Sequence, residues 1–180
     1  MTTWTVRCRL HETYMGGKEK NKHANKKLRA GRGTVGKTPV VGVRGQNGEV
    51  LAIVVENTKA ATLEIFVREN CKSGATIVTD THGGYNNLAA QSYDHIRLNH
   101  SAVEYLRDMA HTNGIESFWT LLKRSYIGIY HYMSAKHLHR YVKEFSFRHN
   151  TAQIGTMEFI KLTIERMADK PLTYRNLRNA

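Results

Sequence analysis

The sequence predicts a single α/β domain in which helices cover a β-sheet of mixed strand direction. Two observations carry this prediction. Strand-like runs dominate the first hundred of the 180 residues, and helical stripes of apolar residues dominate the second half. Because strands joined by a hairpin are antiparallel and strands joined through a helix are usually parallel, this order indicates a mixed sheet.

Five strands are expected, over residues 4–14, 39–44, 50–55, 75–79 and 93–98. The second and third strands flank Gly45-Gln-Asn-Gly48, and an Asn-Gly pair suits a hairpin turn. Residues 50–55 are apolar throughout, which is typical of a strand buried on both faces.

Three longer helices are expected, over residues 59–70, 114–126 and 135–148, with a short helix through Leu88 and a helical piece near Tyr105. Ser134 is the expected N-cap of the last long helix. Residues 1–150 are expected to form the domain, and residues 151–180 a C-terminal helical extension.

The chain carries a formal net charge of +12, from 27 Lys and Arg against 15 Asp and Glu. This charge favours nucleic acid as the partner, since no basic amphipathic helix with an apolar face points to lipid; the alternative is a basic protein without such a partner. No apolar run approaches the roughly 18–20 residues of a membrane span, and the first residues lack the apolar stretch of a signal peptide. A cytoplasmic location is therefore expected.

Residues 18–37 form an expected basic loop, with eight Lys or Arg and one acid, Glu19. By charge alone, a solvated surface loop is as good an interpretation as a binding surface. The two cysteines, Cys8 and Cys71, are too few for a disulfide scaffold or a zinc ribbon.

Two carboxylates and one lysine are the candidate chemical groups. Asp80 follows a buried strand at its carboxyl end, where α/β sheets build their sites, although capping the next turn is the commoner role of such a carboxylate taken by itself. Glu116 and Lys123 are seven residues apart and share one helix face, which could also be a plain solvated face. Together they suit phosphodiester chemistry, in which carboxylates from different elements hold two divalent ions and a lysine contacts phosphate.

Several longer motifs resemble the ISXO2-like DDE transposase domain of bacterial insertion sequences. The resemblance covers roughly residues 8–150 and is carried by residues 12–23, 79–85, 98–101, 111–124 and 137–150. The helix motif Asn113-Gly-Ile-Glu-Ser-Phe-Trp119 is the most specific of these. The resemblance implies a ribonuclease H-like mixed sheet flanked by helices, with Mg²⁺ or Mn²⁺ as cofactor.

The family pattern implies three metal-binding acids. The second falls on Asp80, the third on Glu116, and the basic residue of the signature on Lys123. The first acid should directly precede Glu12-Thr-Tyr, where this sequence has His11. An imidazole removes one negative charge and a bridging carboxylate, and Glu12 points to the other face of the strand, so impaired catalysis is expected.

The leading hypothesis is thus a transposase catalytic domain that cleaves and transfers DNA strands, with a homo-oligomer implied by the family. Relatives usually carry a DNA-reading region ahead of the catalytic core, and its absence here suggests a truncated copy that grips DNA through phosphates. The alternatives are an inactive DNA-binding remnant and a different ribonuclease H-like nuclease. The candidate DNA-binding residues are Lys18, Lys20, Lys22, Lys26, Lys27, Lys123 and Arg124.

Overall fold

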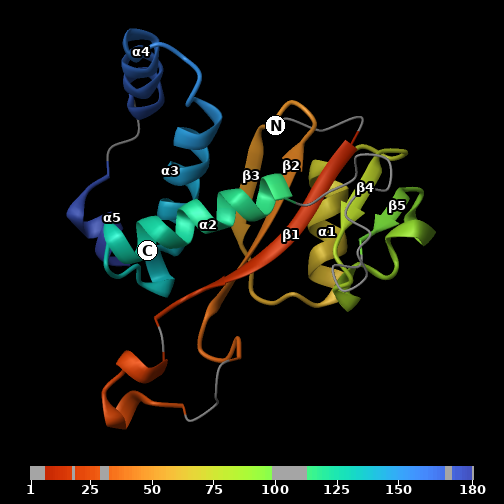
Figure 1. Cartoon of the computed structure of the whole chain (residues 1–180). Helices are drawn as coiled ribbons and strands as arrows, with labels where there is room; N and C mark the ends of the chain where they lie inside the picture. Colours follow the sequence, from red (N-terminus) through yellow and green to blue (C-terminus); the bar gives the residue numbers. More distant parts are fainter. Residues whose placement is uncertain (1–6, 18, 29–32, 99–112, 169–171, 180) are drawn as a thin grey trace.

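The computed structural model describes residues 7–17, 19–28, 33–98, 113–168 and 172–179. Within them a single five-stranded sheet forms the centre of the molecule, in the order β3-β2-β1-β4-β5 (Figure 1). Its strands are β1 (Arg7–Met15), β2 (Thr38–Gly45), β3 (Val50–Val54), β4 (Thr76–Thr79) and β5 (Asp94–Arg97). β1, β2 and β3 pair antiparallel, whereas β4 runs parallel to β1 and β5 parallel to β4. The predicted α/β class and mixed sheet are confirmed.

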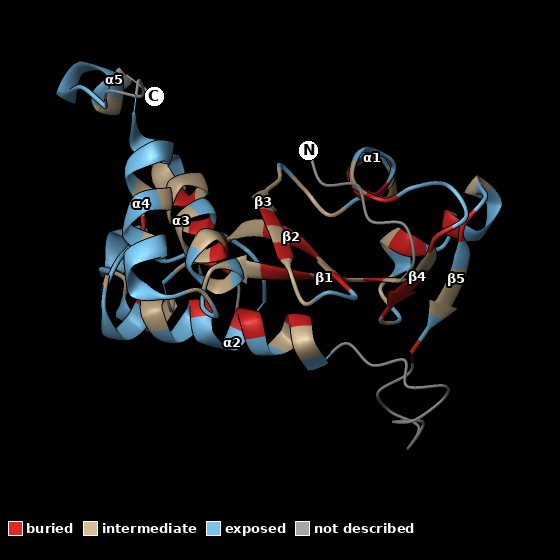
Figure 2. Cartoon of the chain, turned by 90° about the horizontal axis from the view of Figure 1, so that it is seen from above, coloured by how far each residue is buried: buried red, intermediate tan, exposed pale blue. Residues whose placement is uncertain are grey.

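Two helices cover opposite faces of the sheet, and a third packs on its β3 edge (Figure 2). The α-helices are α1 (Ala60–Asn70), α2 (Asn113–Gly128), α3 (Leu138–Asn150), α4 (Thr156–Met167) and α5 (Tyr174–Asn179). Short 3-10 helices are η1 (Glu19–Asn21), η2 (Ala24–Lys26), η3 (Gly83–Tyr85), η4 (Leu88–Gln91) and η5 (Ala135–His137). None of the helices in the described ranges is both long and apolar enough to cross a membrane.

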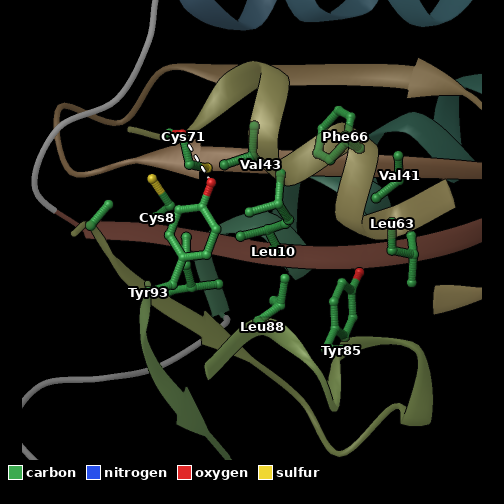
Figure 3. Packing of buried hydrophobic residues seen from close by; sticks show 13 residues of the cluster. Cys8, Leu10, Val41, Val43, Leu63, Phe66, Cys71, Tyr85, Leu88 and Tyr93 are labelled. Carbon is green, nitrogen blue, oxygen red and sulfur yellow. Dashed lines mark hydrogen bonds between the residues drawn. The ribbon is translucent and has the colours of Figure 1, made fainter. Parts of the chain in front are cut away.

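One core lies between α1 and the sheet (Figure 3). Alternate residues of β1, Cys8 and Leu10, face Leu63 and Phe66 of α1, as the two-residue period of a strand requires. The hydroxyl of Tyr93 closes this core by donating to the Cys71 carbonyl at 3.4 Å.

A second core lies between the other face of the sheet and α2 with α3. Its α2 side chains are Ile115, Phe118, Trp119, Leu122 and Tyr126. Phe118 makes edge-to-face contacts with Trp119 on its own helix and with Phe145 on α3. The apolar stripe predicted for this helix is therefore its buried face, and it fixes α2 across β1 and β2.

Two local expectations are wrong. β3, which was expected to be buried on both faces, is an edge strand in which Val50 and Ala52 are buried but Leu51 and Ile53 are only partly buried. Its apolar character reflects two cores that both reach this edge. Ser134 precedes the 3-10 helix η5 instead of the long helix, and its side chain makes no capping hydrogen bond.

After residue 150 the described chain forms the helices α4 and α5, joined by turns and irregular segments, and α4 stands away from the sheet (Figure 1). Phe159 of α4 stacks on Phe147 of α3, with ring centroids 5.6 Å apart, and Arg166 lies over the same Phe147 ring. No residue of α4 is fully buried. The domain boundary at residue 150 stays a prediction, and the helical piece expected near Tyr105 lies outside the described residues.

Gly42 of β2 allows α2 to approach the sheet closely, because a Cβ at this position would lie 2.6 Å from the Trp119 ring. We expect Gly42→Ala to lower the free energy of unfolding by about 1–3 kcal/mol, since the helix must shift. Chemical denaturation measures this change. Gly128→Ala, at the open end of α2 with nothing within 4 Å, is the matched control and should change stability by no more than about 1 kcal/mol. Equal effects of the two substitutions would contradict this account.

Candidate active site

The parallel pairing of β1 with β4 brings His11 and Asp80 together. Arg9 is level with Val78 in this pairing, and continuing the register by two residues sets His11 beside Asp80. The His11 Nε2 atom lies 3.6 Å from Asp80 Oδ2, and both side chains are about one-fifth exposed. The contact is an ion pair only when His11 is protonated, and both side chains are partly open to solvent.

Asp80 is held in place by the turn that it begins. Its Oδ1 accepts a hydrogen bond from the His82 backbone N–H at 2.9 Å. The Thr79 hydroxyl donates to the Asp80 carbonyl at 2.8 Å and also lies 2.9 Å from His95 Nε2. The turn-capping role and the site role of Asp80 are therefore compatible, because one carboxylate oxygen caps the turn and the other faces His11.

Glu116 lies in the first turn of α2, on the same side of the sheet as His11. His11 is level with Gly42 on β2, and Gly42 contacts Ile115 and Trp119 of that helix. Glu116 is partly buried, in line with its predicted place beside the apolar stripe. Across the described ranges, however, no three His, Cys, Asp or Glu side chains are grouped closely enough to hold a metal ion.

Glu12 belongs to the opposite face of the sheet, as predicted from strand alternation. Its buried carboxylate accepts a hydrogen bond from the Tyr85 hydroxyl at 2.9 Å. His82 Nε2 lies 3.8 Å from the other carboxylate oxygen, and His82 Nδ1 accepts from the Gly84 N–H at 3.1 Å, which places the imidazole proton on Nε2. Burial, followed by the Glu12 charge, raises the pKa of Tyr85 well above its usual value.

The predicted DNA-binding residues are spread over two regions. Lys26 and Lys27 are exposed at η2, Lys22 pairs with Glu19 at 2.7 Å, and Lys123 and Arg124 are exposed on α2. Partial desolvation and then the nearby Lys37 ammonium lower the pKa of Lys123. Lys18 and the side chain of Lys20 lie outside the described part of the chain. Lys37 was not singled out from the sequence, although it ends the same basic loop.

Sequence reasoning also missed Tyr85, His82, and the arginines Arg9 and Arg44. Tyr85 and His82 lie within a motif that was used only for its aspartate. Arg9 and Arg44 are level with each other on β1 and β2, a relation that appears only when the strand register is known.

The strand order, the strand directions and the acid at the end of β4 define a ribonuclease H-like α/β domain. Residues 7–150 match the family described as the ISXO2-like transposase domain, and the chain belongs to this family of DDE transposases. A Haemophilus influenzae protein described as an uncharacterized transposase-like protein is 32% identical over 106 residues, which are 59% of this chain and 85% of that protein.

Two solved structures are also similar. The catalytic core domain of BIV integrase gives a TM-score of 0.49 at 12% identity, over 89% of this chain and 96% of that one. A chain of the simian T-cell lymphotropic virus intasome, in complex with a PP2A regulatory subunit, gives 0.47 at 12% identity, over 87% of this chain and 52% of that one. The family assignment does not depend on either structure.

The chemistry of the family is phosphoryl transfer, and the family implies divalent metal. The described residues do not form a set that fits a centre for two ions. An imidazole nitrogen has one lone pair and cannot bridge two ions as a carboxylate does. The buried His11 Nδ1 atom has no hydrogen-bond partner among the described residues. The described residues also group no third ligand with His11 and Asp80.

Tyr85→Phe should destabilise the chain by about 1.5–3 kcal/mol near pH 8, because the buried Glu12 carboxylate loses a donor. The pKa of Tyr85 is raised in the folded state, so its contribution is complete below the unfolded value near 10 and is lost as the pH rises above it. The stability difference between native chain and variant should thus narrow above about pH 10. Urea denaturation across this range measures the difference.

The exposed Tyr174 provides the control, since Tyr174→Phe should leave stability unchanged at each pH. A gap between native chain and Tyr85→Phe that stays constant up to high pH would contradict the role given to the Tyr85 hydroxyl.

Proposed function

We propose that this chain is a DNA transposase catalytic domain that acts on transposon ends and target DNA, and that His11 impairs strand cleavage and strand transfer in this copy. The observation that carries the proposal is the place of His11. Its imidazole lies 3.6 Å from Asp80, and the motif resemblance expects the first acid of the family at this position.

The proposed reaction has two displacements at phosphorus. Water first attacks the phosphorus at a transposon end and breaks its bond to the 3′ oxygen, which leaves as a 3′ hydroxyl. That hydroxyl then attacks a phosphorus of target DNA in line and expels the target strand's own 3′ oxygen. No covalent bond to the protein forms, and we assign no Ser or Tyr nucleophile.

The charge of the site supports impairment. With His11 in place of an acid, the expected set of three carboxylates is reduced to Asp80 and Glu116. A neutral imidazole supplies no negative charge, and a protonated one would cancel that of Asp80. Reversion to aspartate should create the set that Mg²⁺ or Mn²⁺ prefers.

DNA contact is proposed through phosphates. Lys123 and Arg124 lie about two turns further along α2 than Glu116. The other proposed contacts come from the basic loop and are Lys18, Lys20, Lys22, Lys26 and Lys27. The exposure of Lys26, Lys27, Lys123 and Arg124 supports this role, as does the net charge of +12. We further propose that the domain comprises residues 1–150 and that the active assembly is a homo-oligomer.

An inactive DNA-binding remnant is the second candidate function, and the same histidine favours it. Such a remnant would retard transposon-end duplexes in a gel with or without metal and leave them uncut. It would also inhibit an intact relative by joining its assembly on DNA.

His11→Asp should produce Mn²⁺-dependent nicking of a labelled transposon-end duplex well above that of the native chain. His11→Asn, which has similar size but no charge, is the matched control and should give no gain. The double variant His11→Asp with Glu116→Gln should lose the gained activity, because one carboxylate is again missing. Product lengths on a denaturing gel measure all four proteins.

Efficient cutting by the native chain would overturn the proposed impairment and make His11 a working residue. No cutting by His11→Asp, despite normal DNA binding, would favour the remnant instead.

A further inference from the structure

Two arginines face each other across neighbouring strands beside the candidate site. Arg9 on β1 is level with Arg44 on β2, so their side chains share one face of the sheet. Like charges placed directly opposite one another destabilise a sheet. The positive charge of this pair therefore needs a group of opposite charge to offset the repulsion.

Within the described ranges, neither arginine forms an ion pair or a hydrogen bond with an acid. The Nε atoms of both are buried, and neither has a hydrogen-bond partner in the part of the chain that the structure describes. Burial, followed by the charges of Arg44 and Arg7, lowers the pKa of Arg9. Within the described residues, the pair is thus a concentrated positive charge for which no carboxylate partner is seen.

The pair lies on the active-site face of the sheet. His11 follows Arg9 by two residues on the same face, roughly 7 Å along the strand. The start of α2 rests on Arg44, since a Cβ at Gly114 would clash with the Arg44 guanidinium. Gly114 in turn precedes Glu116 by two residues. The arginine pair therefore lies near His11 on β1 and near the start of the helix that carries Glu116.

We propose that Arg9 and Arg44 form an anion site that binds a backbone phosphate of DNA next to His11 and Asp80. The planar guanidinium offers paired N–H donors that match phosphate oxygens, and a phosphate between two arginines would relieve their repulsion. This inference rests on the proposed function in taking DNA as the source of the phosphate, and it names a contact separate from Lys123 and the basic loop.

The test uses the full chain and the variants Arg9→Gln, Arg44→Gln and their combination. Binding of a fluorescein-labelled duplex is measured by anisotropy at several NaCl concentrations. The loss of one phosphate contact should lower the salt slope by about 0.9 and weaken binding roughly five- to tenfold near 0.1 M salt. Lys72→Gln, at an exposed position on the α1 side, removes the same charge and should change the slope little.

A second measurement needs no DNA. Thermal unfolding is compared in sodium phosphate and sodium chloride at equal ionic strength. Phosphate should stabilise the native chain more than the double glutamine variant, which keeps only the general stabilisation by a kosmotropic salt. In chloride, that variant should be at least as stable as the native chain, because the repulsion is gone. Arg9→Lys with Arg44→Lys keeps the charge without the planar donors, and it should retain only part of either effect.

The two measurements separate the possible failures. Loss of phosphate stabilisation in the double variant, with no DNA binding by the native chain, would support the anion site and overturn the proposed function. DNA binding with the same salt slope in native chain and double variant would overturn the arginine site alone. Neither DNA binding nor phosphate stabilisation by the native chain would overturn both.

Discussion

The parallel pairing of β1 with β4 is the constraint on which the site depends. The strands β2 and β3 and the helix α1 lie between them in the sequence, and α1 crosses one face of the sheet before β4 begins. The core beneath α1 fixes the register through Cys8 and Leu10. Once the register is set, His11 and Asp80 must lie side by side on the other face, and no loop needs to move to bring them together.

The alternation of β1 then divides the chemistry between two faces. His11 faces the α2 side, whereas the next residue, Glu12, is buried on the α1 side under the Tyr85 hydroxyl. His82 connects the faces, because its backbone N–H binds Asp80 while its ring faces Glu12. The Glu12 network thus supports the turn that carries Asp80, and Glu12 itself is committed to that structural role.

The sequence allowed the five strands, the long helices and the family to be predicted, because each rests on local periodicity or on a contiguous motif. The position of His11 came from the family motif alone, whereas Asp80 and Glu116 were also singled out by their places at a strand end and on a helix face. Strand register and burial were not predictable in this way. The edge position of β3 depends on which strands pair, and the Arg9–Arg44 contact depends on a match between residues 35 positions apart. The prediction that Ser134 caps the long helix was wrong because the preference of serine for N-cap positions does not tell which kind of helix follows.

Electrostatics connects the two proposals made for this face. A site for divalent ions needs an excess of negative charge, and His11 removes one carboxylate from it. The two nearby guanidiniums favour anion binding further, and their mutual repulsion is screened far less in a partly buried site than in water. In an intact relative, three carboxylates would hold the ions while cationic side chains held the phosphate. In this chain metal binding loses one of its three acids, whereas phosphate binding keeps every cationic side chain proposed for it. DNA binding should therefore persist where catalysis is lost. The two residues concerned, Arg9 for phosphate binding and His11 for catalysis, are two positions apart on β1.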